Sequence, residues 1–357
     1  MGQITKPGTG ETGRRVPCSR FSLEGVAPRD RFALWRDSIN CLFEVEAERE
    51  ERETGFLGEI EAYILGDMAL AHTRTQAQSW ARTPEIIARD GMDHFMIQIY
   101  EKGSMSFRHR GQDRVFAQNG LIVFDLAQDM RSVSSDMANL SLLLPRGLIE
   151  PHLKSAADRH LQILPNDENP MARLLFDHMK TLKAVAGDMT LAQAGEASAS
   201  TAALVTACLN GSEPEPGAGE RGIAFALLVR ARQRIEENLA DPNLTPARVA
   251  RLSGVSRTRL YEMFEPFGGV QAYIRERRLR LAMRMVVDQR FALRPISSIA
   301  EACGFSNDSA FSRAFRNRFG TTARDMRANP NQARLIEPDM ARFVDRRYEN
   351  WIRTLSV

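Results

Sequence analysis

The chain has 357 residues, which is enough for two domains, and a formal net charge of only +3. No apolar run approaches the length of a membrane span, and the N-terminus lacks the apolar core of a signal peptide. These observations exclude an integral membrane protein and lead us to expect a cytoplasmic one. Four scattered cysteines without disulfide or metal-ligand spacing fit that reducing compartment: Cys18, Cys41, Cys208 and Cys303.

The N-terminus contains "GTGETG" at residues 8–13, which matches the dinucleotide-binding pattern G-x-G-x-x-G. That pattern needs a strand before it and a helix after it, whereas here Pro7 and Pro17 flank it and no strand precedes it. We therefore expect residues 1–20 to be disordered and to bind no nucleotide.

Residues 21–210 read as a β-rich domain with flanking helices. Phe32, Trp35 and Ile39 recur at helical spacing, and residues 56–144 then form short alternating runs separated by Gly, Asn and Asp turns. In one run Phe95, Ile97 and Ile99 alternate with Met96, Gln98 and Tyr100. Many short strands with closely spaced turns predict a β-barrel or sandwich.

Two helices are predicted to close this domain. Asn169 and Pro170 are typical of a helix start, and a second helix runs from about Leu191 to Leu209. An apolar stripe on the first helix, Leu175, Met179 and Leu182, needs a partner. Either the chain itself covers this stripe or the same helix of a second chain does, and on the second alternative we predict a homodimer.

The β-rich domain has no predicted metal site. None of the six histidines forms a His-x-His pair with a nearby Glu, and His109 stands alone in "FRHRG". We expect no metal and no cofactor, which leaves the interior free for a small organic effector. The residues expected to line this interior are Trp80, His94, Gln98 and Tyr100.

The two domains are predicted to be joined by residues 211–221. The stretch "NGSEPEPGAGERG" from Asn210 to Gly222 is rich in Pro, Gly and Glu and has almost no apolar content, which is typical of a linker.

A duplicated unit follows the linker. Val249, Ala250, Gly254, Val255 and Ser256 recur fifty residues later as Ile299, Ala300, Gly304, Phe305 and Ser306. Each copy reads as a short helix, a turn with glycine, and a second helix with an apolar stripe and a polar outer face. This is the pattern of a helix-turn-helix unit, although a single copy alone would also fit an ordinary helical hairpin.

Charge favours DNA as the partner of this region. Between Arg221 and Pro330 there are 20 Arg and no Lys against 10 Asp or Glu, so the segment is net +10 and the remainder of the chain −7. A basic segment that coincides with the duplicated unit indicates a polyanionic partner. A continuous helix predicted over residues 271–289 would be about 28 Å long and would hold the two units near the spacing of successive major grooves.

The region after the linker resembles the DNA-binding domain of a known protein family. The patterns "TPARVARLSGVS" and "ISSIAEACGFSNDSAFSRAFRNRFG", with the helix between them, resemble the DNA-binding domain of AraC/XylS-type transcription regulators over residues 222–328. The family's usual proline after Gly320 is missing. The layout of residues 21–210 resembles the cupin-like sensing and dimerisation domain that precedes this domain in many such regulators, and residues 329–357 form a C-terminal extension.

The resemblance implies a DNA-binding regulator that is not an enzyme, that activates transcription with RNA polymerase as partner, and that responds to an effector. It implies base contacts from Arg257, Thr258, Tyr261, Glu262, Asn307, Asp308, Ser309, Ser312 and Arg313. Arg313 is the candidate for guanine and Glu262 for cytosine. Phosphate contacts are implied for Arg275, Arg277, Arg316 and Arg318.

Two alternatives remain. The N-terminal domain could bind a protein partner in place of a small molecule. The chain could also be a DNA-repair alkyl transferase, since such enzymes carry the same kind of DNA-binding domain beside a reactive cysteine, for which Cys18 in "VPCSR" is the candidate. No histidine or basic residue is spaced to activate Cys18.

Overall fold

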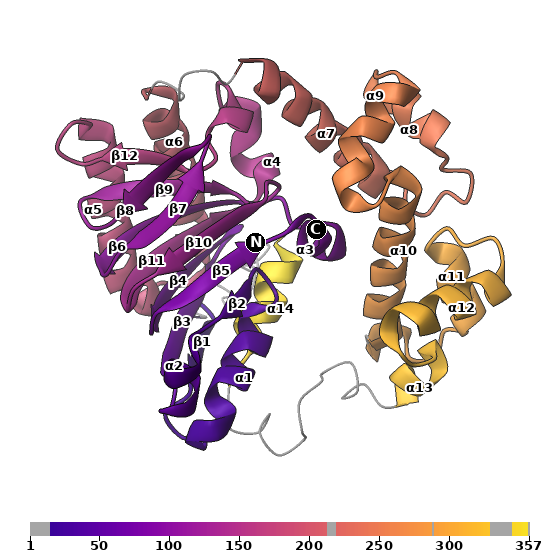
Figure 1. Ribbon diagram of the computed structural model, residues 1–357, viewed down its shortest axis with the longest axis horizontal. Helices are drawn as coiled ribbons and strands as arrows, with labels where there is room; N and C mark the ends of the chain where they lie inside the picture. The colour runs from indigo at the N-terminus through magenta and orange to yellow at the C-terminus, as the bar shows by residue number, and fades with distance from the viewer. Residues whose placement is uncertain (1–14, 213–218, 288, 329–344, 356–357) are drawn as a thin grey trace, which may run out of the picture.

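The computed structural model describes residues 15–212, 219–287, 289–328 and 345–355 (Figure 1). A β-rich domain and a helical domain lie side by side, which gives the α+β class expected from the sequence. Residues 8–13, which carry the nucleotide-binding pattern, lie outside the described residues.

The β-rich domain consists of two sheets in which all strand pairs are antiparallel. The larger sheet has the order β1 (Cys18–Ser22), β3 (Gly58–Leu65), β4 (Met68–Thr75), β11 (Met137–Leu144), β6 (Phe95–Lys102), β9 (Gly120–Asp125) and β12 (Gln162–Pro165). The smaller has the order β2 (Glu44–Glu46), β5 (Gln78–Arg82), β10 (Met130–Ser134), β7 (Met105–His109) and β8 (Gln112–Phe116). The expected barrel is thus a cupin-like jelly roll of two sheets that do not join into one closed barrel.

Strand β6 shows why the sequence alternates as it does. Phe95, Ile97 and Ile99 belong to the apolar cluster that includes the helices outside the larger sheet, whereas Met96 and Tyr100 belong to the cluster between the sheets. Successive side chains of a strand point to opposite faces. The membership of alternate residues in two different clusters therefore shows that both faces of β6 are buried.

The helices of this domain are α1 (Pro28–Ile39), α2 (Arg49–Glu53), α3 (Pro84–Asp90), α4 (Arg146–Ile149), α5 (Pro170–Val185) and α6 (Leu191–Asn210). Helix α5 begins at the predicted position, where the Asn169 side chain accepts hydrogen bonds from the backbone N–H groups of Met171 and Ala172.

The apolar stripe on α5 is covered within the chain. Leu175 and Met179 are fully buried and Leu182 is 3% exposed, in the cluster that also contains residues of α6 and of the outer face of the larger sheet. The proposed role of this stripe as a dimer interface is therefore wrong, because one sheet face and one neighbouring helix already satisfy it.

Residues 15–20 are ordered, in contrast to the expected disorder up to residue 20. Arg15 forms a bridge with Thr190, and β1 pairs with β3 from Cys18 onward. The reason is alternation that was too short to recognise in the sequence: Ser19 and Phe21 point inward and are almost completely buried.

The helical domain contains α7 (Gly219–Glu237), α8 (Pro246–Ser253), α9 (Arg257–Phe264), α10 (Val270–Val287), α11 (Ile296–Ala302), α12 (Asp308–Phe319) and α13 (Ala323–Ala328). It has two apolar clusters, one built on α7 to α9 and the first part of α10, the other on the last part of α10 and α11 to α13. Helix α10 therefore belongs to both halves and joins them. Helix α7 begins inside the segment expected to be a linker.

The C-terminal extension returns to the β-rich domain. Helix α14 (Arg347–Thr354), yellow in Figure 1, lies beside α1 and contacts β1 and β3 of the larger sheet, away from the other C-terminal helices. Tyr348 and Ile352 are 2% and 4% exposed and join the cluster between the sheets.

Among the described helices, none combines the length and the apolar composition that crossing a membrane requires. The described residues also contain no group of three His, Cys, Asp or Glu side chains placed to hold a metal ion.

Candidate nucleic-acid interface and effector pocket

The first duplicated unit has the geometry that the sequence predicts. Thr245 caps α8, with Pro246 in its first turn, and Gly254 ends that helix with a φ of 68°. Ser256 then caps α9 by accepting a hydrogen bond from the N–H of Arg259. Ser253 is the inward-facing residue near the turn, since Leu252 is 40% exposed.

The second unit repeats this arrangement. Helix α11 ends before Gly304, whose φ is 80°, and Asn307 caps α12 by accepting a hydrogen bond from the N–H of Ala310. After Gly320, the Thr322 side chain accepts a hydrogen bond from the N–H of Asp325. This cap starts α13 in place of the proline that the family pattern would supply.

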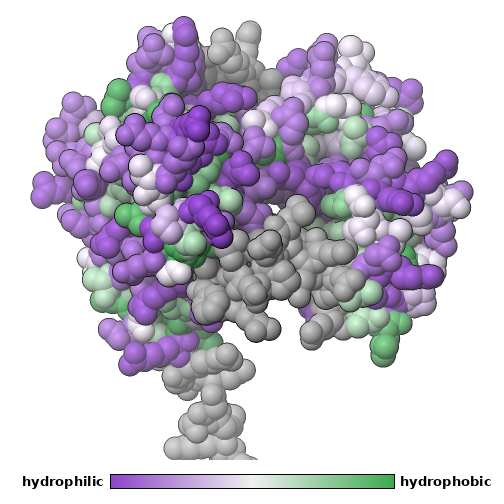
Figure 2. Space-filling model, turned by 60° about the horizontal axis from the view of Figure 1, so that its bottom comes forward, coloured by the Kyte–Doolittle hydropathy of each residue, from purple (hydrophilic) through white to green (hydrophobic). Residues whose placement is uncertain are grey.

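Both second helices, α9 and α12, expose a polar face. All the residues implied to contact bases are exposed: Arg257, Thr258, Tyr261, Glu262, Asn307, Asp308, Ser309, Ser312 and Arg313. Arg313 forms no ion pair with any described residue, whereas Glu262 pairs with Arg259 at 3.1 Å on the surface. A surface pair of this kind contributes about 0–1 kcal/mol, so both side chains remain available to a ligand. Hydrophilic side chains predominate over the helical domain, at the right of Figure 2.

The four arginines expected to contact phosphate differ in their surroundings. Arg275 on α10 and Arg316 on α12 are exposed. Arg318 is partly exposed and donates to Glu276, with an Nε–Oε2 distance of 2.8 Å. A phosphate contact by Arg318 therefore has to compete with a carboxylate of its own chain.

Arg277 is buried, which makes its expected phosphate contact wrong. Its side chain is 7% exposed and forms two hydrogen bonds to the carboxylate of Glu236 on α7, at 2.5 and 3.0 Å. Burial alone would lower the pKa of Arg277, but the carboxylate of Glu236 raises it above its ordinary value. Arg277 follows Val270 and Ile274 along the buried face of α10. Its ion pair with Glu236 therefore holds α10 against α7.

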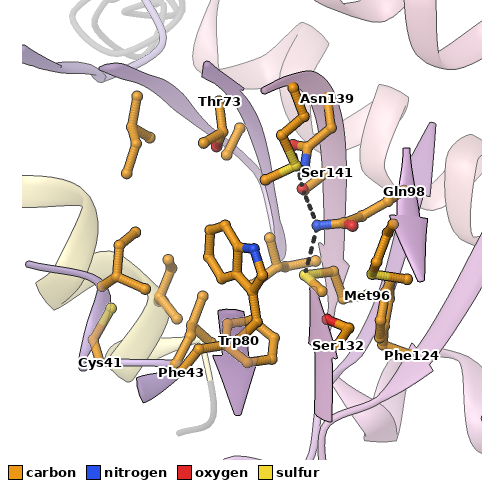
Figure 3. A pocket seen from close by; sticks show the side chains of 18 of the residues that line it. Cys41, Phe43, Thr73, Trp80, Met96, Gln98, Phe124, Ser132, Asn139 and Ser141 are labelled. Atoms are coloured by element: carbon orange, nitrogen blue, oxygen red, sulfur yellow. Dashed lines mark hydrogen bonds between the residues drawn. The ribbon is translucent and has the colours of Figure 1, made fainter. Parts of the chain in front are cut away.

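A cavity lies between the two sheets of the β-rich domain. Trp80 from β5 and Gln98 from β6 line it (Figure 3). Tyr100 from β6 lines it as well. The other lining residues are mainly apolar and include Met96, Met105, Met130 and Met137. None of the described residues that line the cavity carries a formal charge.

The polar groups of the cavity lie on neighbouring strands. Gln98 donates to Ser141 at 2.9 Å, and Ser141 donates to Asn139 at 3.3 Å (Figure 3). Ser132, from the opposite sheet, is 6% exposed, and its hydroxyl oxygen has no hydrogen-bond partner among the described residues. An uncompensated buried hydroxyl is costly, so this group favours a bound polar atom.

His94 does not line the cavity, which corrects the sequence expectation. It precedes β6 by one residue, is fully buried beside Asp93, and forms a hydrogen bond with the backbone of Ile352 on α14. Burial lowers the pKa of His94, while Asp93 and this hydrogen bond act to raise it. The alternation that places Met96, Gln98 and Tyr100 inside starts only after His94.

The two domains contact each other through α3. This helix follows β5 directly and packs on α10, and Ala88 on α3 belongs to the first apolar cluster of the helical domain. Gly91 ends α3 with a φ of 64°, and an added Cβ there would lie 1.9 Å from the guanidinium carbon of Arg277. A second contact between the domains comes from Arg232 of α7 in the helical domain, which donates to the backbone oxygen of Ala127 in the β-rich domain.

Arg82, at the end of β5, fixes α3 to the strands of the β-rich domain. Its fully buried guanidinium donates to both carboxylate oxygens of Asp90, at 2.9 and 3.0 Å, and to the backbone oxygens of Leu42, Leu126 and Met92. Sequence reasoning missed Arg82, α3 and α14. Thr83 followed by Pro84 is a helix-start signal that could have identified α3.

Comparison with known proteins defines the class of protein. Residues 249–329 match the model of a helix-turn-helix domain, and residues 35–210 match that of an AraC-binding-like domain. With its two exposed recognition helices, the chain belongs to the AraC family of transcription regulators. This membership makes the alkyl-transferase alternative the weaker one.

Similar proteins cover one or both domains. The transcriptional activator NphR of Rhodococcus sp. is 23% identical over 299 residues, which are 81% of this chain and 86% of that protein. The regulatory protein SoxS of Escherichia coli strain K12 is 39% identical over 95 residues, which are 26% of this chain and 85% of that protein. The crystal structure of the AraC-like transcriptional activator CuxR has 27% identity and a TM-score of 0.54, covering 73% of this chain and 94% of that one.

Proposed function

We propose that the protein is a cytoplasmic, sequence-specific DNA-binding activator that responds to a small organic effector. The observation that carries the DNA-binding part is the pair of helices α9 and α12, both with exposed polar faces and both tied to α10. The similarity to NphR and CuxR, which are named as activators, supports an activating role in concert with RNA polymerase.

The length of α10 fits binding to adjacent grooves. Its 18 residues span about 27 Å, whereas successive major-groove segments on one face of DNA lie about 34 Å apart. The recognition helices can therefore enter two grooves one turn apart if each projects a few ångströms beyond α10.

Selection from random DNA tests this proposal. The full chain is incubated with a pool of random-sequence duplexes, and the bound fraction is sequenced after several rounds. We expect an enriched site with two conserved blocks about 10 base pairs apart, one for each recognition helix. Binding without any enriched sequence would contradict sequence-specific recognition by these helices.

The cavity supports a neutral effector. Its described lining residues carry no charge, so a carboxylate or an ammonium group entering it would lose hydration without gaining an ionic partner. The unpartnered hydroxyl of Ser132 favours a ligand with one hydrogen-bonding group on an otherwise apolar body.

Thermal shift of the full chain with the matched pair benzyl alcohol and benzoate tests this: the alcohol should raise the melting temperature and the anion should not.

The contact between the domains gives the effector a route to the DNA-binding domain. Trp80 lines the cavity, and Arg82, two residues further along β5, holds the end of α3 that packs on α10. A ligand that favours one position of β5 would therefore favour one position of α10, provided that its affinity differs between the two. The homodimer stays a prediction, and any interface would have to use residues other than the covered stripe of α5.

A further inference from the structure

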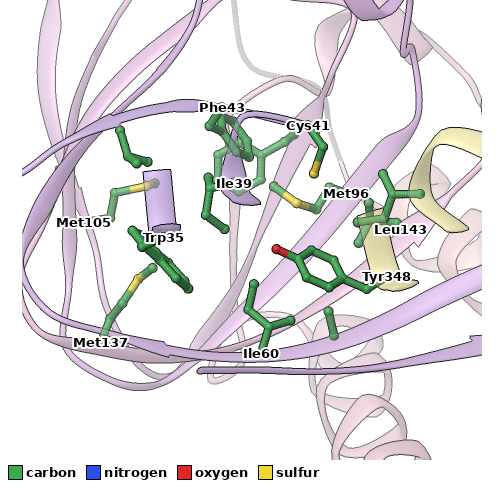
Figure 4. Close-up of a cluster of buried hydrophobic side chains, with 14 of the residues drawn as sticks. Trp35, Ile39, Cys41, Phe43, Ile60, Met96, Met105, Met137, Leu143 and Tyr348 are labelled. Carbon is green, nitrogen blue, oxygen red and sulfur yellow. The ribbon is translucent and has the colours of Figure 1, made fainter. Parts of the chain in front are cut away.

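The cavity between the sheets is partly filled by the C-terminal helix of the same chain. Tyr348 and Ile352 of α14 both line it, and Figure 4 shows the Tyr348 ring among Ile60, Met96 and Leu143. The space that remains free is about 70 Å³. One water molecule needs about 10–15 Å³ of such space, so the free part of the cavity has room for only a few waters.

Polar contacts hold α14 at this position. The Tyr348 hydroxyl forms a hydrogen bond with the buried Ser38 of α1, which also donates to Glu349 at 3.1 Å. Arg346 donates to Asp37 at 2.7 Å and to Glu349. These contacts join residues 346–349, at the start of α14, to α1.

The side chain that α14 inserts resembles the ligand that the cavity favours. A tyrosine side chain is an apolar aromatic ring with one hydroxyl group, and burial raises the pKa of Tyr348, which keeps it neutral. Residues 329–344 separate α14 from α13 in the sequence, and such a segment can reach about 55 Å when fully extended. Helix α14 can therefore leave the cavity while it stays attached to the DNA-binding domain.

We propose that α14 is an internal competitor of the effector, and that a neutral aromatic molecule carrying one hydrogen-bonding group binds where Tyr348 now lies. This inference rests on the proposed function, because it takes the cavity to be the effector site. Effector binding and α14 docking then exclude each other. The effector thereby displaces the C-terminal extension from the β-rich domain.

Fluorescence titration with N-phenyl-1-naphthylamine tests the competition. This neutral aromatic amine has one N–H donor and becomes fluorescent in apolar sites. It is titrated into the full chain, into a chain that ends at residue 344, and into the variants Tyr348→Ala and Tyr348→Phe. We expect the shortened chain to bind the probe at least tenfold more tightly than the full chain, Tyr348→Ala to lie between them, and Tyr348→Phe to stay near the full chain because the ring remains.

Two controls separate the possible failures. Ser132→Phe in the shortened chain fills the cavity from the opposite wall and should abolish binding, while circular dichroism verifies that each variant is folded. If the shortened chain is unfolded, Tyr348→Ala against Tyr348→Phe carries the comparison. Equal and tight binding by all the folded chains overturns the competition but leaves the effector site intact. Absence of binding by a folded shortened chain overturns both the competition and the effector site.

Discussion

Two arginines on α10 should separate stability from DNA affinity. Arg277 and Arg275 are two residues apart, but Arg277 is buried against Glu236 whereas Arg275 is exposed. Removing one partner of a buried ion pair typically costs about 3–5 kcal/mol, because the other charge loses its partner. Since the Glu236 side chain is 35% exposed and can regain some hydration, we expect Arg277→Ala to cost about 3 kcal/mol, at the low end of that range.

Urea unfolding of the full chain, followed by circular dichroism, measures this cost. With a slope of about 1–3 kcal/mol per molar urea, a loss of 3 kcal/mol moves the midpoint of the helical domain down by roughly 1–3 M. Arg275→Ala is the matched control and should change the free energy of unfolding by less than about 0.5 kcal/mol. The same variant should bind DNA more weakly and with a smaller salt dependence. If Arg277→Ala unfolds like the wild type but loses DNA affinity, the ion pair is not formed in solution and Arg277 contacts phosphate after all.

Three further predictions concern specificity, pH and assembly. Arg313→Ala should cost about 1–3 kcal/mol on the selected site and relax the preference at one base position, whereas Arg316→Ala should weaken all sequences alike; identical base preferences in both variants, from competition binding, would contradict these roles. Burial lowers the pKa of His160 to about 4, so between pH 6.5 and 4 the unfolded chain binds a proton that the folded chain does not. The free energy of unfolding should therefore fall by up to roughly 3 kcal/mol over this pH range. In urea unfolding, His160→Gln should make the free energy of unfolding depend less on pH. If the predicted homodimer uses the exposed Leu174 and Leu191 of α5 and α6, changing both to Glu should leave a monomer in sedimentation, and an unchanged dimer would place the interface elsewhere.

The helical domain was predictable in detail because its signals are local. Thr245, Ser256 and Asn307 cap helices within three residues of their own position, and Gly254 and Gly304 end helices through their own positive φ. Capping and left-handed conformations depend on few neighbours, so a linear pattern contains the information needed. The faces of α9 and α12 follow from the helical period alone.

The errors arise where distant parts of the chain meet. Arg277 looks like an ordinary exposed arginine until α7 supplies Glu236, forty-one residues earlier. The stripe of α5 could not reveal that the larger sheet would cover Leu175, and His94 could not reveal that Ile352 would supply its backbone contact. Local spacing states that a side chain is apolar or charged, but it does not state which partner the fold brings to it.

The competition between α14 and an effector also sets the size of the response. If removal of α14 strengthens ligand binding tenfold, its docking is worth about 1.4 kcal/mol in the full chain. Because the ligand and α14 exclude each other, α14 is undocked in every chain that has bound the ligand. A ligand can then move the chain from about nine-tenths docked to mostly undocked, provided that its concentration exceeds its dissociation constant for the full chain several times over. A docking energy of this size suits a switch, since stronger docking would demand more ligand and weaker docking would leave the C-terminal helix free without any ligand.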